Sequence, residues 1–231
     1  MDITPDHLVL FQWGAVHLNA TIVYTWAVML LLVVAARLAT RNICIDGPRT
    51  RWQNALEALV TGIRSQVREV SGGEESDDYL PFIGTLFLFI AVSNELHAVP
   101  GWHAPTGSLS TTAALAICVA LSVPLFGIRK VGLRKYLHHY LSPVFFMLPI
   151  HMISEISRTI ALAVRLFGNI MSGSMVVALL LVIAPLFFPM LIQVLDLIIG
   201  LIQAYIFAIL AMVYIAAAIR REDEKGQEEK G

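Results

Sequence analysis

Residues 160–207 decide the fold, and they read IALAVRLFGNIMSGSMVVALLLVIAPLFFPMLIQVLDLIIGLIQAYIF. They contain two long apolar runs, and the segment 184–189 between the runs holds Pro185 and Pro189. Proline removes a backbone donor and clashes with the preceding helical turn, so each run is predicted to form a helix that is interrupted at this segment. The stretch therefore predicts a helical hairpin whose arms are each long enough to cross a membrane.

The rest of the chain has the same apolar character. Of its 231 residues, 57% are hydrophobic and 14% are charged, and the mean hydropathy is +0.73. A soluble domain carries about 25% charged residues, so lipid is expected to cover most of this surface. Membrane spans are predicted over residues 20–41, 79–99, 110–128, 141–183 and 190–219.

Residues 51–70 show a different pattern, because their apolar side chains recur at helical spacing and most of their charges lie elsewhere on the wheel. This pattern predicts an amphipathic helix that lies on the membrane surface or docks on a partner. The predicted fold class is an all-α membrane protein with five transmembrane helices plus one amphipathic surface helix, the last two helices forming a long tilted hairpin. A single polytopic domain, 20–219, lies between an N-terminal segment, 1–19, and a solvated, disordered tail, 220–231.

The basic residues predict the orientation of the chain. They cluster after the first, third and fifth spans, and the other connections lack Lys and Arg. These clusters comprise Arg41, Arg49, Arg51, Arg64 and Arg68, then Arg129, Lys130, Arg134 and Lys135, then Arg220 and Arg221. The positive-inside rule places the N-terminus in the periplasm and the C-terminus in the cytoplasm of a bacterial inner membrane.

Two of the 16 basic residues, Arg158 and Arg165, lie deep within an apolar run. A charge at the bilayer centre costs about 2.5–3.5 kcal/mol on insertion scales, so it is expected to face protein or water. Arg158 could instead extend towards the cytoplasmic interface, but apolar sequence continues far on both sides of Arg165. Arg165 is therefore the first candidate functional residue.

Polar residues form one stripe on each arm of the predicted hairpin. The stripe on the first arm comprises Glu155, Arg158, Leu162, Arg165, Asn169 and Ser172, and that on the second comprises Gln193, Asp196, Gly200 and Gln203. Spacings of three and four residues put each set on one helical face. Lipid would penalise such stripes, so they are expected to face each other or a third element across a hydrated path.

The chemistry of these residues predicts an electrostatic gate for ions. Arg165 and Gln203 lie at equal sequence distances from Ala184, so an antiparallel hairpin places them at one depth, with Asp196 level with Ser172. Arginine stays charged and can hold a passing carboxylate ionised, whereas Asp196 can bind and release protons or help to coordinate a small cation. Asn169 and Gln203 can fix the guanidinium or line a water path.

Three motifs resemble subunit a of the F-type ATP synthase membrane sector. They are Ser157-Arg158-Thr159 leading into Arg165-Leu166-Phe167-Gly168-Asn169, Gln203-Ala204-Tyr205-Ile206-Phe207, and Leu80-Pro81-Phe82-Ile83-Gly84-Thr85-Leu86-Phe87 with Asn94. The similarity covers most of the chain from about residue 50 onward. It implies a non-catalytic stator subunit that packs against a ring of c subunits and joins the b-subunit stalk and the rest of the synthase.

The resemblance also implies roles for individual residues. Arg165 matches the family's essential arginine, which separates two half-channels leading to and from the carboxylate of the ring, and Asn169 and Gln203 match positions near it. Ser174 and Asp196 occupy positions of the outer half-channel that often carry Glu and His. Because Ser174 cannot titrate, Asp196 is expected to be the main acid. The coupling ion stays open between H⁺ and Na⁺, with H⁺ favoured.

Further candidates are assigned less narrowly. Glu155 either lines the inner half-channel or pairs with Arg158, one turn away. Gln193, Asn94 and Glu95 are candidates for half-channel lining, and Glu95 and His97 either line the outer entry or are solvated at the interface. No cofactor, metal site or nucleic-acid partner is predicted. The alternative function is a stand-alone secondary ion transporter, which would carry a complete site and often inverted repeats, and no internal repeat is visible.

Overall fold

The computed structural model describes residues 9–13, 16–40, 51–71, 78–99, 101–132, 147–184 and 187–228. Five of its helices are long and apolar enough to cross a membrane, which confirms the predicted fold class. They are α1 (Ala20–Thr40), α3 (Leu80–Glu95, continued by the 3₁₀ turn η3, Leu96–Ala98), α4 (Leu109–Val131), α6 (Met147–Ile183) and α7 (Phe188–Glu228). The amphipathic helix α2 spans Arg51–Ser71, and a second 3₁₀ turn, η4, spans Pro105–Gly107.

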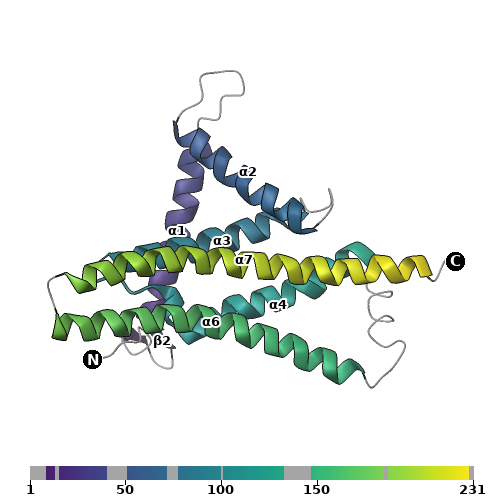
Figure 1. The fold of residues 1–231 in the computed structure, drawn as a ribbon. Coiled ribbons are helices and arrows are strands. Elements are labelled where there is room, and N and C mark those ends of the chain that lie inside the picture. Colours follow the sequence, from purple (N-terminus) through teal and green to yellow (C-terminus); the bar gives the residue numbers. More distant parts are fainter. Residues whose placement is uncertain are drawn as a thin grey trace.

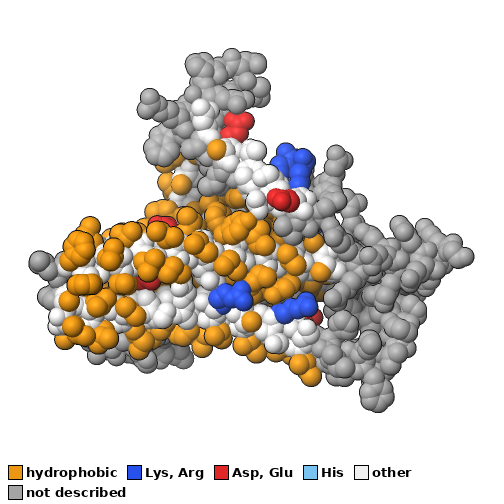
Figure 2. Space-filling view, viewed as in Figure 1, with side chains coloured by type: hydrophobic (Ala, Val, Ile, Leu, Met, Phe, Trp, Pro, Cys, Tyr) orange, Lys and Arg blue, Asp and Glu red, His pale blue; other side chains and the backbone are white. Residues whose placement is uncertain are grey.

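Helices α3, α4, α6 and α7 run side by side, and α1 crosses them steeply (Figure 1). The core lies where α7 packs on α3, α4 and α6. Its fully buried side chains include Phe207, Met212 and Ile215 of α7, Ile90 of α3 and Leu166 of α6. In contrast, the hairpin of α6 and α7 presents a mostly apolar outer surface that basic side chains interrupt (Figure 2).

The hairpin arms are too long to stand upright in a bilayer. The apolar part of each arm has 31 residues, Ile153–Ile183 in α6 and Phe188–Ala218 in α7. At 1.5 Å per residue each part is about 46 Å long, against a hydrocarbon core of about 30 Å. Burying the whole apolar length requires an inclination of about 50° from the membrane normal. The steep crossing of α1 over the hairpin in Figure 1 agrees with such a tilt.

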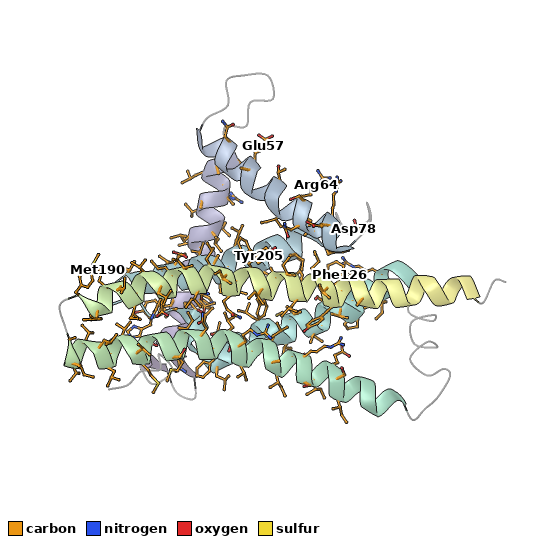
Figure 3. The ribbon with its side chains drawn as sticks, viewed as in Figure 1. Glu57, Arg64, Asp78, Phe126, Met190 and Tyr205 are labelled. Atoms are coloured by element: carbon orange, nitrogen blue, oxygen red, sulfur yellow. The ribbon has the colours of Figure 1, made fainter. Side chains whose placement is uncertain are left out.

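Helix α2 docks on the chain's own helices. Val67 is buried, and Ile63 packs half-buried against the same core cluster. The hydroxyl of Tyr205 on α7, labelled in Figure 3, donates to Oε1 of Gln66 on α2, and the two oxygens lie 2.7 Å apart. The apolar face predicted from the sequence therefore has an intramolecular partner in α3 and α7.

The N-terminal segment and the C-terminal tail differ from the sequence-based expectation. An antiparallel pair of short strands, β1 (Val9–Trp13) and β2 (Val16–Asn19), precedes α1. These residues carry no helical periodicity. The expected disordered tail is wrong as far as Glu228, since α7 continues through a run rich in Arg, Glu and Lys, which are good helix formers. Helix α6 begins at Met147, and the predicted part of that span over 141–146 lies outside the described residues.

The hairpin turn is shorter than predicted. Helix α6 ends at Ile183, and α7 begins at Phe188 with Pro189 in its first turn. Proline is tolerated there, because the first backbone N–H groups of a helix have no intrahelical acceptor. Pro189 therefore starts the second arm.

Candidate functional site

Two contacts fix the register of the α6–α7 hairpin. The Asp196 carboxylate of α7 lies directly over Gly173 of α6, where an added Cβ would overlap it. Nearer the other end of the hairpin, the Arg158 guanidinium lies 5.2 Å from the centroid of the Tyr214 ring. The first contact agrees within one residue with the expected pairing of Asp196 and Ser172. Interpolating between the two contacts places Arg165 level with Tyr205, within one turn of Gln203.

A small pocket lies where α3, α6 and α7 meet. Its lining residues are Asn94, His97 and Ala98 of the α3–η3 segment, Asn169 and Ile170 of α6, and Gln193, Asp196 and Leu197 of α7. The space open to the centre of a water-sized sphere is ≈ 10 Å³. That is about the minimum for one water molecule, and the polar lining offers it several partners. The pocket thus joins four of the predicted site residues.

The polar stripe of α7 contacts α3 directly. The Gln193 side-chain amide donates to the Ala98 carbonyl at 3.1 Å. One turn beyond Asp196, the Gly200 carbonyl accepts a 2.9 Å hydrogen bond from Nδ2 of Asn94. The polar stripe of α7 therefore faces mainly a third element, the α3–η3 segment. It meets α6 at the pocket, where Asn169 contributes to the lining.

His97 was left open from the sequence between the outer entry and a solvated position at the interface, and the structure places it in the pocket. Its side chain lines the pocket together with Asp196. Its Nδ1 atom is buried and has no hydrogen-bond partner within the described part of the chain. The spacing of Asn94 and His97, three residues apart near the end of a predicted span, is the signal that could have indicated a shared inward face.

Arg165 lies on the outer surface of the hairpin. Its side chain is exposed and, within the described part of the chain, makes no hydrogen bond or ion pair. Its neighbours along the helix, Val164 and Ile160, are 53% and 56% exposed. Leu162, on the predicted stripe, is buried at 2%. The stripe of α6 therefore divides, with Leu162 packed into the core and its two arginines left on the surface.

The remaining predicted site residues lie outside the pocket. Gln203 is buried, and its Nε2 atom has no hydrogen-bond partner among the residues that the structure describes. The Ser174 hydroxyl donates within its own helix, at 2.7 Å to the Ile170 carbonyl. Glu95 is exposed and does not line the pocket. Glu155 is half-buried. Arg158 stacks on the Tyr214 ring and, among the described residues, forms no ion pair with Glu155.

Comparison with known proteins gives a consistent family assignment. The family model described as ATP synthase A chain matches residues 22–216. The chain belongs to this family. It is 55% identical to "ATP synthase subunit a 1" of Crocosphaera subtropica over 225 residues, which is 97% of each chain. It is 51% identical to "ATP synthase subunit a" of Nitrosospira multiformis over 238 residues, covering all of this chain and 94% of the relative.

This membership identifies an integral membrane subunit of the F-type ATP synthase, with a part in ion transport and ATP synthesis. The resemblance found in the sequence motifs is confirmed. The alternative of a stand-alone secondary transporter is not supported, because the similarity covers nearly the whole chain.

Proposed function

We propose that this chain is the stator ion channel of a rotary F-type ATP synthase. It provides two half-channels that pass H⁺ to and from a carboxylate on each c subunit, and so couples ion flow to ring rotation. The chain itself catalyses no covalent step. Its proposed partners are the c-ring, the b-subunit stalk and the rest of the synthase, in a bacterial inner membrane with the N-terminus outside.

The surface position of Arg165 carries this proposal. A permanent cation in the middle of the apolar span Ile153–Ile183 lies exposed among exposed apolar side chains. Contact with lipid would cost about 2.5–3.5 kcal/mol on insertion scales, so a partner is expected to cover it. An acidic side chain on that partner would offset the charge, and the flanking apolar surface suits a helical partner within the membrane. A ring of helices that each carry a carboxylate meets both requirements.

The pocket at Asp196 supports an outer half-channel. It lies near the 96–108 connection and the hairpin turn, the side that the positive-inside rule places outside the cell. Asp196 and His97 are groups that exchange protons, and Asn94, Asn169 and Gln193 can orient water between them. An ion would pass from this pocket towards the level of Gln203 and Arg165.

The inner half-channel is proposed on the other side of Arg165. Glu155 lies ten residues before Arg165, about 15 Å along the helix towards the cytoplasmic end. It is half-buried and makes no ion pair among the described residues. Arg165 stands between the two paths, where its charge prevents direct leakage of protons from one to the other.

The test is Arg165→Ala in the complete synthase, with Arg158→Gln as the matched control on the same helix. We expect Arg165→Ala to abolish ion-driven ATP synthesis in membrane vesicles, because no fixed cation then makes the ring carboxylate release its proton. The amount of assembled complex should not change, since Arg165 is exposed and supports no packing. Arg158→Gln should retain most of the synthesis rate.

The decisive contrary result is ATP-coupled pumping by Arg165→Ala at close to the wild-type rate. Loss of synthesis in both arginine variants would also contradict a specific role for Arg165. Measuring the sodium dependence of ATP hydrolysis in the same vesicles tests the choice of H⁺, since a sodium-coupled enzyme would be activated by that ion.

A further inference from the structure

We infer that Asn94 and Thr106 form a clamp that positions the Asp196 turn of α7, and so sets the rate of ion entry. This inference rests on the outer half-channel proposed above. The clamp comprises the side chains of Asn94 and Thr106 and the backbone of Gly200. In this clamp Asn94 is a positioning residue. Its place in the pocket alone would make Asn94 one of several lining residues.

The clamp joins three elements through two buried hydrogen bonds. The Thr106 hydroxyl in η4 donates to Oδ1 of Asn94 at 2.7 Å, and Nδ2 of Asn94 donates to the Gly200 carbonyl at 2.9 Å. Asn94 is 3% exposed and Thr106 is fully buried. Water therefore cannot easily replace either bond, so both contacts act at full strength.

The order of donors and acceptors gives the clamp a direction. A side-chain amide has one accepting and one donating end. Because the Thr106 hydroxyl occupies the accepting oxygen, the NH₂ group is left to face Gly200. Thr106 therefore selects the orientation in which Asn94 holds α7, although Thr106 itself does not line the pocket.

Glycine at position 200 allows the close approach that the clamp requires. A Cβ at Gly200 would lie 3.0 Å from the Cβ of Asn94, which is closer than ordinary carbon contacts. Small residues permit such approach between membrane helices. Any larger side chain at this position would push α3 and α7 apart.

The clamped residue stands at the centre of the functional stripe of α7. Gly200 follows Asp196 by four residues and precedes Gln203 by three, so all three share one helical face. The grip lies one turn, about 6 Å, from Asp196. The Gln193 bond to Ala98 holds the other side of Asp196. The Asp196 turn is thus held on both sides, while the carboxylate oxygens accept no hydrogen bond from the residues that the structure describes.

The experiment measures passive ion flux through the membrane sector in proteoliposomes for four variants. Thr106→Val removes the hydroxyl at nearly constant volume, and Thr106→Ser restores it. Thr112→Val is the matched control, since Thr112 is equally buried but its hydroxyl, among the described residues, bonds only to carbonyls at the start of its own helix. The fourth variant, Gly200→Ala, displaces Asn94 from the other side.

We expect Thr106→Val and Gly200→Ala each to lower the flux about tenfold, since small displacements of a reacting group have effects of this order. Thr106→Ser and Thr112→Val should stay near the wild-type rate. A positioning role also predicts strong non-additivity, because in an Asp196→Asn background the clamp no longer has a carboxylate to place. Thr106→Val should therefore cause no further loss there.

Two outcomes separate the clamp from the proposed half-channel. If Asp196→Asn slows the flux while both Thr106→Val and Gly200→Ala keep the wild-type rate, the clamp is wrong and the half-channel stands. If Asp196→Asn has no effect, the outer path itself lies elsewhere. Full additivity of Thr106→Val with Asp196→Asn would reduce the bond to a structural support and overturn the inference. If Thr106→Val fails to assemble, Gly200→Ala provides the same comparison.

Discussion

At the scale of single residues, His97 changes the chemistry available to the proposed outer half-channel, here called the outer path. The sequence predicted Asp196 as its main acid, because Ser174 cannot titrate, and left His97 open between the outer entry and a solvated interface position. The structure brings His97 from α3 into the pocket with Asp196 and leaves the Ser174 hydroxyl bonded to its own helix. The two titratable groups of the path thus come from different helices, and the second appears at a position that hairpin periodicity cannot indicate.

This pairing predicts coupled effects of substitution. We expect Asp196→Asn to reduce ion flux strongly and His97→Gln to reduce it by a smaller factor, because both groups take part in one transfer. The double variant should be no slower than Asp196→Asn alone, since residues that act as a unit are not additive. Flux measurements on the three variants in proteoliposomes test this. Independent, multiplying losses would place His97 on a different path.

Gly173 supplies a second prediction at this scale. An alanine Cβ there would overlap the Asp196 carboxylate, so Gly173→Ala must move that group. In most helices Gly→Ala is favourable by about 1 kcal/mol. At Gly84, where a Cβ meets nothing within 4 Å, we expect the substitution to leave flux unchanged. Gly173→Ala should slow flux and gain no thermal stability. A wild-type flux in Gly173→Ala would show that Asp196 tolerates displacement.

At the scale of elements, hydropathy predicted the helices well because length and apolar content determine whether a segment can cross a bilayer. The hairpin register was predicted to within one residue at Asp196, since two helices joined by a short turn have few alternative pairings. The role of Asn94 could not be predicted, because it depends on a backbone carbonyl of α7 more than 100 residues away in sequence. The strands β1 and β2 were missed for lack of a periodic signal.

The attachment of α2 to α7 gives a prediction at this scale. The Tyr205–Gln66 bond links the two helices, and a hydrogen bond of this kind contributes about 0.5–1.5 kcal/mol. Tyr205→Phe should therefore raise amide hydrogen exchange in α2 by a factor of about 2 to 10. Tyr214→Phe is the matched control. The contact of Tyr214 with Arg158 is made by the ring, and this substitution keeps the ring. Equal exchange in both variants would mean that apolar packing at Val67 alone holds α2.

At the scale of the whole molecule, the ends of α3 divide the structure into two sides. The pocket is lined by the α3–η3 segment at the C-terminal end of α3, and η4 follows in the chain. Asp78 lies just before the other end of α3, next to α2 (Figure 3). If the pocket opens outside the cell, α2 must lie on the cytoplasmic side. The proposed direction of ion entry therefore depends on the orientation of the whole chain, which the basic clusters predict.

Labelling of single cysteines tests that orientation. Asp78 and Val99 are both exposed and lie just before and just after the α3–η3 span, so neither substitution disturbs the core. In a background without Cys44 and Cys118, we expect a membrane-impermeant maleimide to label Val99→Cys in intact cells. Asp78→Cys should react only in inverted vesicles, because Arg51, Arg64 and Arg68 hold that side in the cytoplasm. The reverse pattern would place the Asp196 pocket on the cytoplasmic side, and ions would then enter at the Glu155 end of the hairpin during synthesis.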